Sequence, residues 1–174
     1  MTTRAISLGK IDIFLAQPVD DFADAANTGL RIAMKKYSHI TFVGVWDAGT
    51  NGDDIQLDLQ EHTASTGGSS QDLDIITDYF YRSETTLDGD EAWSKTTQAA
   101  ASEIAAIAGS AETENLLVFE VHQSQLSDGY THLSVDSPDF GNNATKFGAI
   151  LAIGWLLAAR EPTLLPAALT GDYP

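Results

Sequence analysis

The chain has 174 residues, enough for one domain built around a single core. Its 25 Asp and Glu against 9 Lys and Arg give a net charge of −16, and a field of that sign repels phosphates. We therefore expect no nucleic acid partner. The sequence contains no cysteine, which excludes disulfides and thiolate metal sites.

Neither a secretion signal nor a membrane segment is expected. The first ten residues carry Arg4 and no apolar segment of the kind that a signal peptide needs. The longest apolar run, Phe147–Ala159, is too short to cross a bilayer as a helix and contains Gly148 and Gly154. This run is more typical of a buried core element.

Short segments with apolar and polar residues in alternation recur along the chain, as half-buried antiparallel strands require. In chain order the predicted strands are Ile11–Ala16, Leu30–Met34, Ile40–Trp46, Ile55–His62, Ile75–Arg82, Ala92–Thr97, Leu116–His122, Thr131–Asp136 and Phe147–Leu157.

The first of these strands is expected to end at Gln17-Pro18, because proline cannot donate a ladder hydrogen bond. The third strand is apolar on both faces, which predicts that it is central in its sheet and that Val43→Asp unfolds the domain. In the strand Ile75–Arg82, the same alternation places Tyr79 and Tyr81 on one face and Phe80 on the other.

The connections are turns and polar loops. Asn51-Gly52 is a strong hairpin signal, and Asp128-Gly129 predicts a hairpin that pairs Leu116–His122 with Thr131–Asp136. The loop Thr63–Gln71 is small and polar. Gln98–Gly109 is ambiguous, because its alanines suit a helix whereas the neighbouring strands favour an extended connection.

Together these elements predict an all-β fold, an antiparallel β-sandwich or jelly-roll-like single domain. We expect the domain to span residues 11–160. An N-terminal arm would occupy residues 1–10, and an extended Pro-rich tail residues 161–174.

One loop could hold a metal ion. Asp47, Asn51, Asp53 and Asp54 surround two glycines, and oxygen-rich turns of this kind can bind calcium. The spacing lacks the EF-hand pattern, and Asp and Asn are also ordinary turn residues. A plain turn is therefore the favoured interpretation, and the same holds for the turn at Asp88, Asp90 and Glu91.

Histidines and tryptophans offer further candidates. His122 and His132 would approach each other across the predicted hairpin, near Glu120 and Asp136, but their spacing is looser than that of a zinc site. Surface histidines are the favoured interpretation. Trp46 and Trp155 are expected in the core, whereas Trp93, beside an acidic turn, could form a sugar-stacking platform if it is exposed.

No motif for catalysis is present. No serine lies in a G-x-S-x-G sequence, and Thr66-Gly67-Gly68-Ser69 lacks the lysine of a phosphate-binding loop. We therefore expect a protein that is not an enzyme and needs no cofactor.

The order of several segments resembles a family of small virion structural proteins of tailed phages and prophages, over roughly residues 11–160. The segments that carry the resemblance are Ala25–Gly29, Tyr37 with Ile40–Trp46, Gly52–Asp54 with Leu57 and Leu59, Thr63–Gly68, Leu87–Trp93 and Leu126–Tyr130 before Val135.

The resemblance implies a structural role at the capsid surface of a virion, most simply as a capsid decoration or cement protein. Its partners would be the major capsid protein and copies of itself, as a dimer or trimer, with both terminal arms reaching neighbours. A tail-tube or head–tail connector subunit is a neighbouring possibility. The alternative from another class is a free β-sandwich module that binds glycans or calcium.

Overall fold

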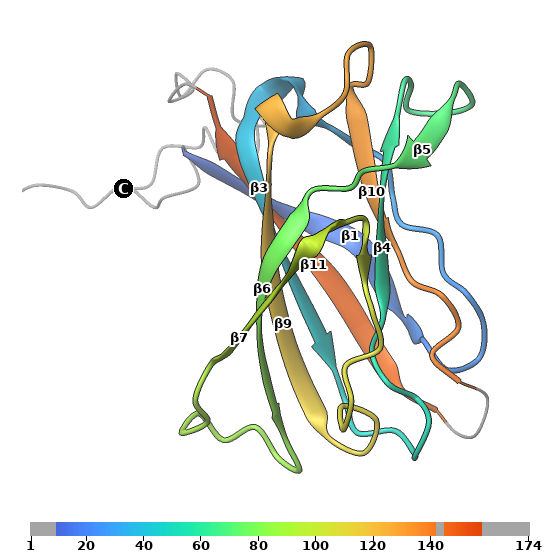
Figure 1. The fold of residues 1–174 in the computed structure, drawn as a ribbon, viewed down its shortest axis with the longest axis vertical. Coiled ribbons are helices and arrows are strands. Elements are labelled where there is room, and N and C mark those ends of the chain that lie inside the picture. The colour runs from blue at the N-terminus through green and yellow to red at the C-terminus, as the bar shows by residue number, and fades with distance from the viewer. Residues whose placement is uncertain (1–9, 142–144, 158–174) are drawn as a thin grey trace, which may run out of the picture.

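The computed structural model describes residues 10–141 and 145–157, which form two antiparallel sheets packed face to face (Figure 1). The larger sheet has the strand order β1 (Ile11–Asp21), β11 (Phe147–Leu156), β3 (Tyr37–Trp46), β9 (Glu114–His122), β6 (Ile76–Glu84) and β7 (Ser94–Ala101). The smaller sheet contains β2 (Ile32–Ala33), β10 (His132–Asp136), β4 (Leu57–His62), β5 (Ser70–Asp72) and β8 (Glu103–Ile104). The predicted β-sandwich is confirmed.

The core lies between the sheets, and long strands such as β3 and β9 contribute one residue in two to it. From the six-stranded sheet, Phe42 of β3 and Phe119 of β9 stack with their ring centroids 5.1 Å apart. From the other sheet, Leu59 and Leu133 are completely buried. Alternation along each strand therefore separates a core face from an outer face, as the sequence pattern predicts.

Trp46 fills the core at the end of β3, as expected, and two glycines make room for it. A Cβ atom on Gly44 or on Gly148 would lie 2.0 Å from the indole ring of Trp46. Because Gly148 is the cross-strand partner of Trp46, the missing side chain lets the ring lie flat across β11. These glycines are therefore needed for packing.

The first strand does not end at Pro18, as predicted, but continues to Asp21. Its pairing with β11 shifts in register between Leu15 and Gln17 and again between Gln17 and Asp20. Because β1 is an edge strand and Pro18 lies within these irregularities, no regular ladder hydrogen bond is lost there.

Two predicted hairpins are wrong, because the strands concerned belong to different sheets. β3 and β4 flank Asn51-Gly52, yet β3 pairs with β11 and β9 whereas β4 pairs with β10, β5 and β8. β9 and β10 are likewise separated, and the 3₁₀ helix η3 (Gln123–Gln125) follows β9. Both turns are crossovers between the layers of the sandwich.

Several smaller expectations are settled. β3 is central, but Val43 is only half-buried on the outer face, whereas Phe42 faces the core. The segment predicted over Leu30–Met34 shortens to β2, followed by the 3₁₀ helix η2 (Met34–Lys36).

The ambiguous Gln98–Gly109 contains no helix: it belongs to β7 and β8 as far as Ile104 and is irregular after that. Part of the predicted loop Thr63–Gln71 belongs to β5, and its turn is held by the Arg31 guanidinium, which donates to the backbone oxygens of Ala64 and Gly67. The predicted arm (apart from Lys10) and the tail at 161–174 lie outside the described residues.

Candidate functional site: the outer face of the six-stranded sheet

The side of the six-stranded sheet that points away from the core, called the outer face below, is mostly apolar over β11, β3 and the start of β1. Ile13, Leu15, Val45 and Phe147 are each at least 40% exposed there. The outward positions of β11, of β3 and of residues 11–15 of β1 carry no Asp, Glu, Lys or Arg: Ile11, Ile13, Leu15, His39, Thr41, Val43, Val45, Phe147, Ala149, Leu151, Ile153 and Trp155. Beyond the irregularities of β1, Asp21 is the partner of Phe147 and borders this region. In a chain with 25 acidic residues, this region stands out.

A shallow apolar pocket adjoins this surface where β6 meets β9. Phe80, Trp93 and Val118 line it. The Arg82 guanidinium carbon lies 4.5 Å from the Trp93 ring centroid, a cation–π contact that orients the indole. Trp93 is 45% exposed, which the sequence left open and which a sugar-stacking platform would require.

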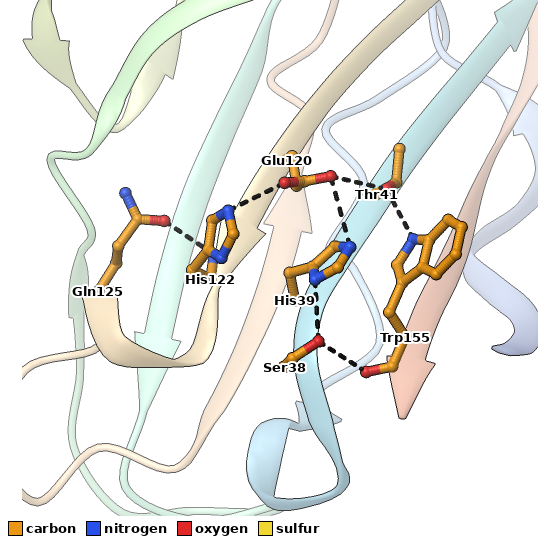
Figure 2. A network of polar contacts seen from close by, with 7 residues as sticks. All are labelled: Ser38, His39, Thr41, Glu120, His122, Gln125 and Trp155. Atoms are coloured by element: carbon orange, nitrogen blue, oxygen red, sulfur yellow. Dashed lines mark hydrogen bonds and ion pairs between the residues drawn. The ribbon is translucent and has the colours of Figure 1, made fainter. Parts of the chain in front are cut away.

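A polar cluster lies at one end of the same face (Figure 2). The start of β3 meets the ends of β9 and β11 there, because neighbouring strands run antiparallel. In the register, His39 is opposite His122 of β9 on one side and Trp155 of β11 on the other. The His39 ring centroid is 5.2 Å from that of His122 and 5.3 Å from that of Trp155.

Glu120 is the acceptor at the centre of the cluster. Trp155 Nε1 donates to Thr41 Oγ1 over 3.2 Å, and the Thr41 hydroxyl in turn donates to Glu120 Oε2 over 3.2 Å. The other carboxylate oxygen, Oε1, lies 2.9 Å from His122 Nε2. Because an ionised carboxylate can only accept, His122 Nε2 carries a hydrogen.

The second ring nitrogen of His122 fixes the same tautomer. The His122 side chain, at the N-cap of η3, accepts a hydrogen bond from the backbone N–H of Gln125, and the Gln125 side chain accepts from the backbone N–H of His122. Since Nε2 donates to Glu120, the accepting nitrogen is Nδ1. This reciprocal cap ties the orientation of the imidazole to the turn after β9.

His39 has the opposite tautomer. The Ser38 hydroxyl donates its single hydrogen to the Trp155 backbone oxygen over 3.2 Å, and Ser38 Oγ lies 2.9 Å from His39 Nδ1. The hydrogen of this second contact therefore belongs to Nδ1. In the neutral ring, Nε2 of His39 presents a lone pair toward Glu120 Oε2, 3.7 Å away.

The predicted approach of His122 and His132 is wrong. His132 lies in β10 of the other sheet, where its cross-strand partner is His62. Asp136 is on β10 as well, and its Oδ1 accepts from Ser134 Oγ and from the backbone N–H of Gly29. The sequence placed Glu120 and His122 on one strand correctly, but His39 joins them only through the pairing of β3 with β9.

The acidic loop after β3 is organised around a buried lysine. Lys146 is fully buried, and its ammonium donates to the backbone oxygens of Asp47, Ser110, Ala111 and Thr113 over 2.9 to 3.3 Å. Burial lowers the pKa of Lys146 from its ordinary value, while the nearby carboxylates of the loop oppose that shift. An internal cation thus already neutralises part of this acidic region.

The predicted calcium ligands have local roles. Asp53 Oδ2 accepts from the backbone N–H and the hydroxyl of Thr50, and Asp54 Oδ1 accepts from Ser110 Oγ and the backbone N–H of Ala111. In the described part of the chain, Asp47, Asp53 and Asp54 do not bring their carboxylates together as a group of metal-ligating atoms. Calcium binding by these residues and Asn51 stays the less favoured interpretation of the loop.

Two groups among the described residues do bring three His, Asp or Glu ligand atoms within 4.8 Å of one another: His39, Glu120 and His122, and Glu84, Asp90 and Glu91. The second group flanks the predicted turn at Asp88. Some burial raises the pKa of Glu91, but hydrogen bonds from the backbone N–H groups of Gly89 and Asp88 outweigh it, and the pKa lies below its ordinary value. Those bonds account for the Glu91 position.

Trp155 corrects another expectation, since its side chain is 42% exposed on the outer face and is not in the core. The alternation in β11 puts it there: Ala152 and Ile150 face inward at even positions, so the odd-numbered Trp155 faces outward. This position could have been found from the sequence by extending the period of two to the end of the strand.

Comparison with known proteins finds no matching protein-family model, no matching curated protein and no matching solved structure. Within residues 10–141 and 145–157, no helix has the length and apolar character needed to cross a membrane.

Proposed function

We propose that this chain is a non-enzymatic structural subunit of a phage virion, a capsid decoration or cement protein that assembles through the outer face of its six-stranded sheet. The observation that carries the assembly role is the exposed apolar surface of β1, β11 and β3. Contiguous exposed apolar surface of this kind is characteristic of protein–protein contact sites. The virion as the site of assembly rests on the sequence resemblance.

A second copy of the same chain is the occupant that we propose for the outer face. Two chains of net charge −16 repel each other, and the repulsion is smallest where no carboxylates meet. The outward positions of β11, of β3 and of residues 11–15 of β1 meet that condition. Two twisted sheets can also pack face to face in an aligned arrangement, with side chains such as Leu15 and Val45 interdigitating. A dimer or trimer would then contact the major capsid protein through other surfaces.

Sedimentation velocity of the purified chain tests the self-association. The variant Ile13→Asp/Phe147→Asp changes two exposed residues, 50% and 49% accessible, and should shift an oligomer to monomers without unfolding. Leu30→Asp is the matched control, because Leu30 is 56% exposed but precedes β2 of the other sheet. A wild-type chain that stays monomeric at high concentration contradicts the proposal.

The virion assignment needs its own measurement. Mass spectrometry of purified particles should find this chain at a ratio to the major capsid protein that is near one or a simple fraction. A few copies per particle would indicate the neck or tail, where a tail-tube or connector subunit belongs. Deletion of residues 161–174 should leave the domain folded and abolish assembly, and particle binding by that truncated chain would contradict the role of the tail.

The exposed Trp93 favours one alternative, a free module that binds glycans. Its indole, held by Arg82 beside Phe80, offers a surface on which a sugar ring can stack. A glycan array with the wild type and Trp93→Ala distinguishes the two functions. Binding that depends on Trp93, together with absence of the chain from particles, would replace the virion assignment.

A further inference from the structure

We propose that His39, Glu120 and His122 form a binding site for a divalent transition-metal ion of the zinc class. The three side chains come from two neighbouring strands and lie at one end of the outer face (Figure 2). The site does not depend on the assembly role or on the virion assignment, since it rests only on the geometry within one chain.

The distances suit a small ion. His39 Nε2 is 3.7 Å from Glu120 Oε2, and His122 Nε2 is 2.9 Å from Glu120 Oε1. Ligands bound tetrahedrally at about 2.0–2.1 Å from zinc lie about 3.4 Å from one another. Small rotations of these side chains, two of which are exposed, would therefore bring all three ligand atoms to one ion.

The hydrogen-bond directions leave a gap that a cation fills. Glu120 Oε2 already accepts from Thr41, and neutral His39 has its hydrogen on Nδ1, where it donates to Ser38. When His39 is neutral with this tautomer, His39 Nε2 and Glu120 Oε2 are two electron-rich atoms that face each other over 3.7 Å. The contact of Nδ1 with Ser38 also holds the His39 ring, as hydrogen bonds do for metal-bound imidazoles.

His122 can bind the ion through Nε2 only after a change of tautomer. At present Nε2 carries the hydrogen and donates to Glu120, so metal binding requires the hydrogen to move to Nδ1. The backbone N–H of Gln125 then loses its acceptor on His122 and turns to solvent. Two imidazoles and a carboxylate match the preferred ligands of zinc, and water would complete the coordination.

Isothermal titration with zinc chloride alone tests the site. The wild type should bind one zinc ion per chain, and His39→Gln, Glu120→Gln and His122→Gln should each lower the affinity at least about tenfold. His132→Gln is the matched control, because His132 is a half-buried histidine of the other sheet, and it should bind like the wild type. Circular dichroism without zinc should show that all variants are folded.

Nuclear magnetic resonance of the wild type gives a readout that needs no variant. On addition of zinc, the imidazole signals of His39 and His122 and the amide signal of Gln125 should shift, while those of His62 and His132 stay in place. Absence of zinc binding, unchanged affinity in His39→Gln or His122→Gln, or shifts at His62 and His132 in place of His39 and His122 would overturn the proposal.

Discussion

The ammonium of Lys146 lies 2.9 Å from the backbone oxygen of Asp47, and this contact joins the start of β11 to the end of β3 from inside the protein. Three more backbone oxygens accept from the same ammonium, all in the segment 110–113 before β9. A single buried side chain thus ties together three loops at one end of the sandwich, where chain reversals leave carbonyl groups without ladder partners.

Lys146→Met should destabilise the protein by about 3 kcal/mol or more, because it leaves buried carbonyl oxygens without a donor. Urea denaturation measures the change in the free energy of unfolding. Lys95→Met is the control: that side chain is 51% exposed and pairs with Asp78 on the surface, so the loss should stay below about 1 kcal/mol. Equal losses of stability in the two variants would show that the hydrogen bonds of the buried Lys146 ammonium contribute little.

The two faces of β3 should respond differently to a charge. Phe42→Asp places a carboxylate in the core and should cost about 4 kcal/mol or more, enough to unfold the domain. Val43→Asp places it on the half-buried outer face and should cost about 1–2 kcal/mol. This revises the expectation from the sequence that Val43→Asp unfolds the chain. Thermal denaturation followed by circular dichroism compares the two variants. A melting temperature that is lower for Val43→Asp than for Phe42→Asp would refute the assigned faces.

Gly148→Ala should lower the melting temperature, since a methyl group there meets the indole ring of Trp46. The indole is enclosed and cannot move aside without disturbing the core, so the cost should be about 1–3 kcal/mol. Ala149→Gly, at the adjacent half-buried outward position, removes a methyl group in place of adding one and controls for the local backbone. A Gly148→Ala variant as stable as the wild type would contradict the packing of Trp46.

His62 should make stability depend on pH. Burial, followed by the nearby Arg31 guanidinium, lowers its pKa below the ordinary 6.5. The unfolded chain therefore binds a proton near pH 6.5 that the folded chain binds only at lower pH. The stabilising effect of neutral His62 is complete above that pH and is lost as the pH falls.

Urea denaturation of the wild type and His62→Gln at pH 7.5 and at pH 5.5 measures this contribution. The wild type should lose stability relative to His62→Gln at the lower pH. The acidic surface affects the free energy of unfolding of both proteins equally, so its effect cancels when the two values are subtracted. If the difference in the free energy of unfolding between the two proteins is constant, or grows in favour of the wild type as the pH falls, the lowered pKa of His62 is contradicted.

The tautomers of His39 and His122 should be opposite in the metal-free protein. The hydrogen of neutral His39 belongs on Nδ1, and that of His122 on Nε2, because Ser38 and Gln125 impose these directions. Two-dimensional ¹H–¹⁵N spectra of the imidazole rings above pH 7.5 report each tautomer directly. The Ser38→Ala variant should release His39 from this preference and leave His122 unchanged.

The two-sheet fold could be predicted because its signal is local. The alternation in Leu57–His62 or Leu117–Val121 shows a half-buried strand regardless of what the strand pairs with. The candidate site could not be predicted in the same way. Glu120 and His122 share a strand, but His39 is far away in the sequence, and its position opposite His122 depends on the register between β3 and β9.

The turns show the same division. Asn51-Gly52 and Asp128-Gly129 have the composition of hairpin turns, and each does reverse or redirect the chain. Whether the next strand pairs with its predecessor or crosses to the other sheet depends on which apolar faces can be buried together, and that is a property of the whole core.

By itself the sequence determined the charge, the exclusion of thiolate chemistry, and most of the strands with their alternating faces, since composition and a period of two need no partner. Only the tertiary structure decided the strand order, which enclosed Lys146 among carbonyl groups and brought His39 to Glu120 and His122. The physical reason is that strand pairing and register are selected by contacts between residues distant in the chain, which must together fill one core.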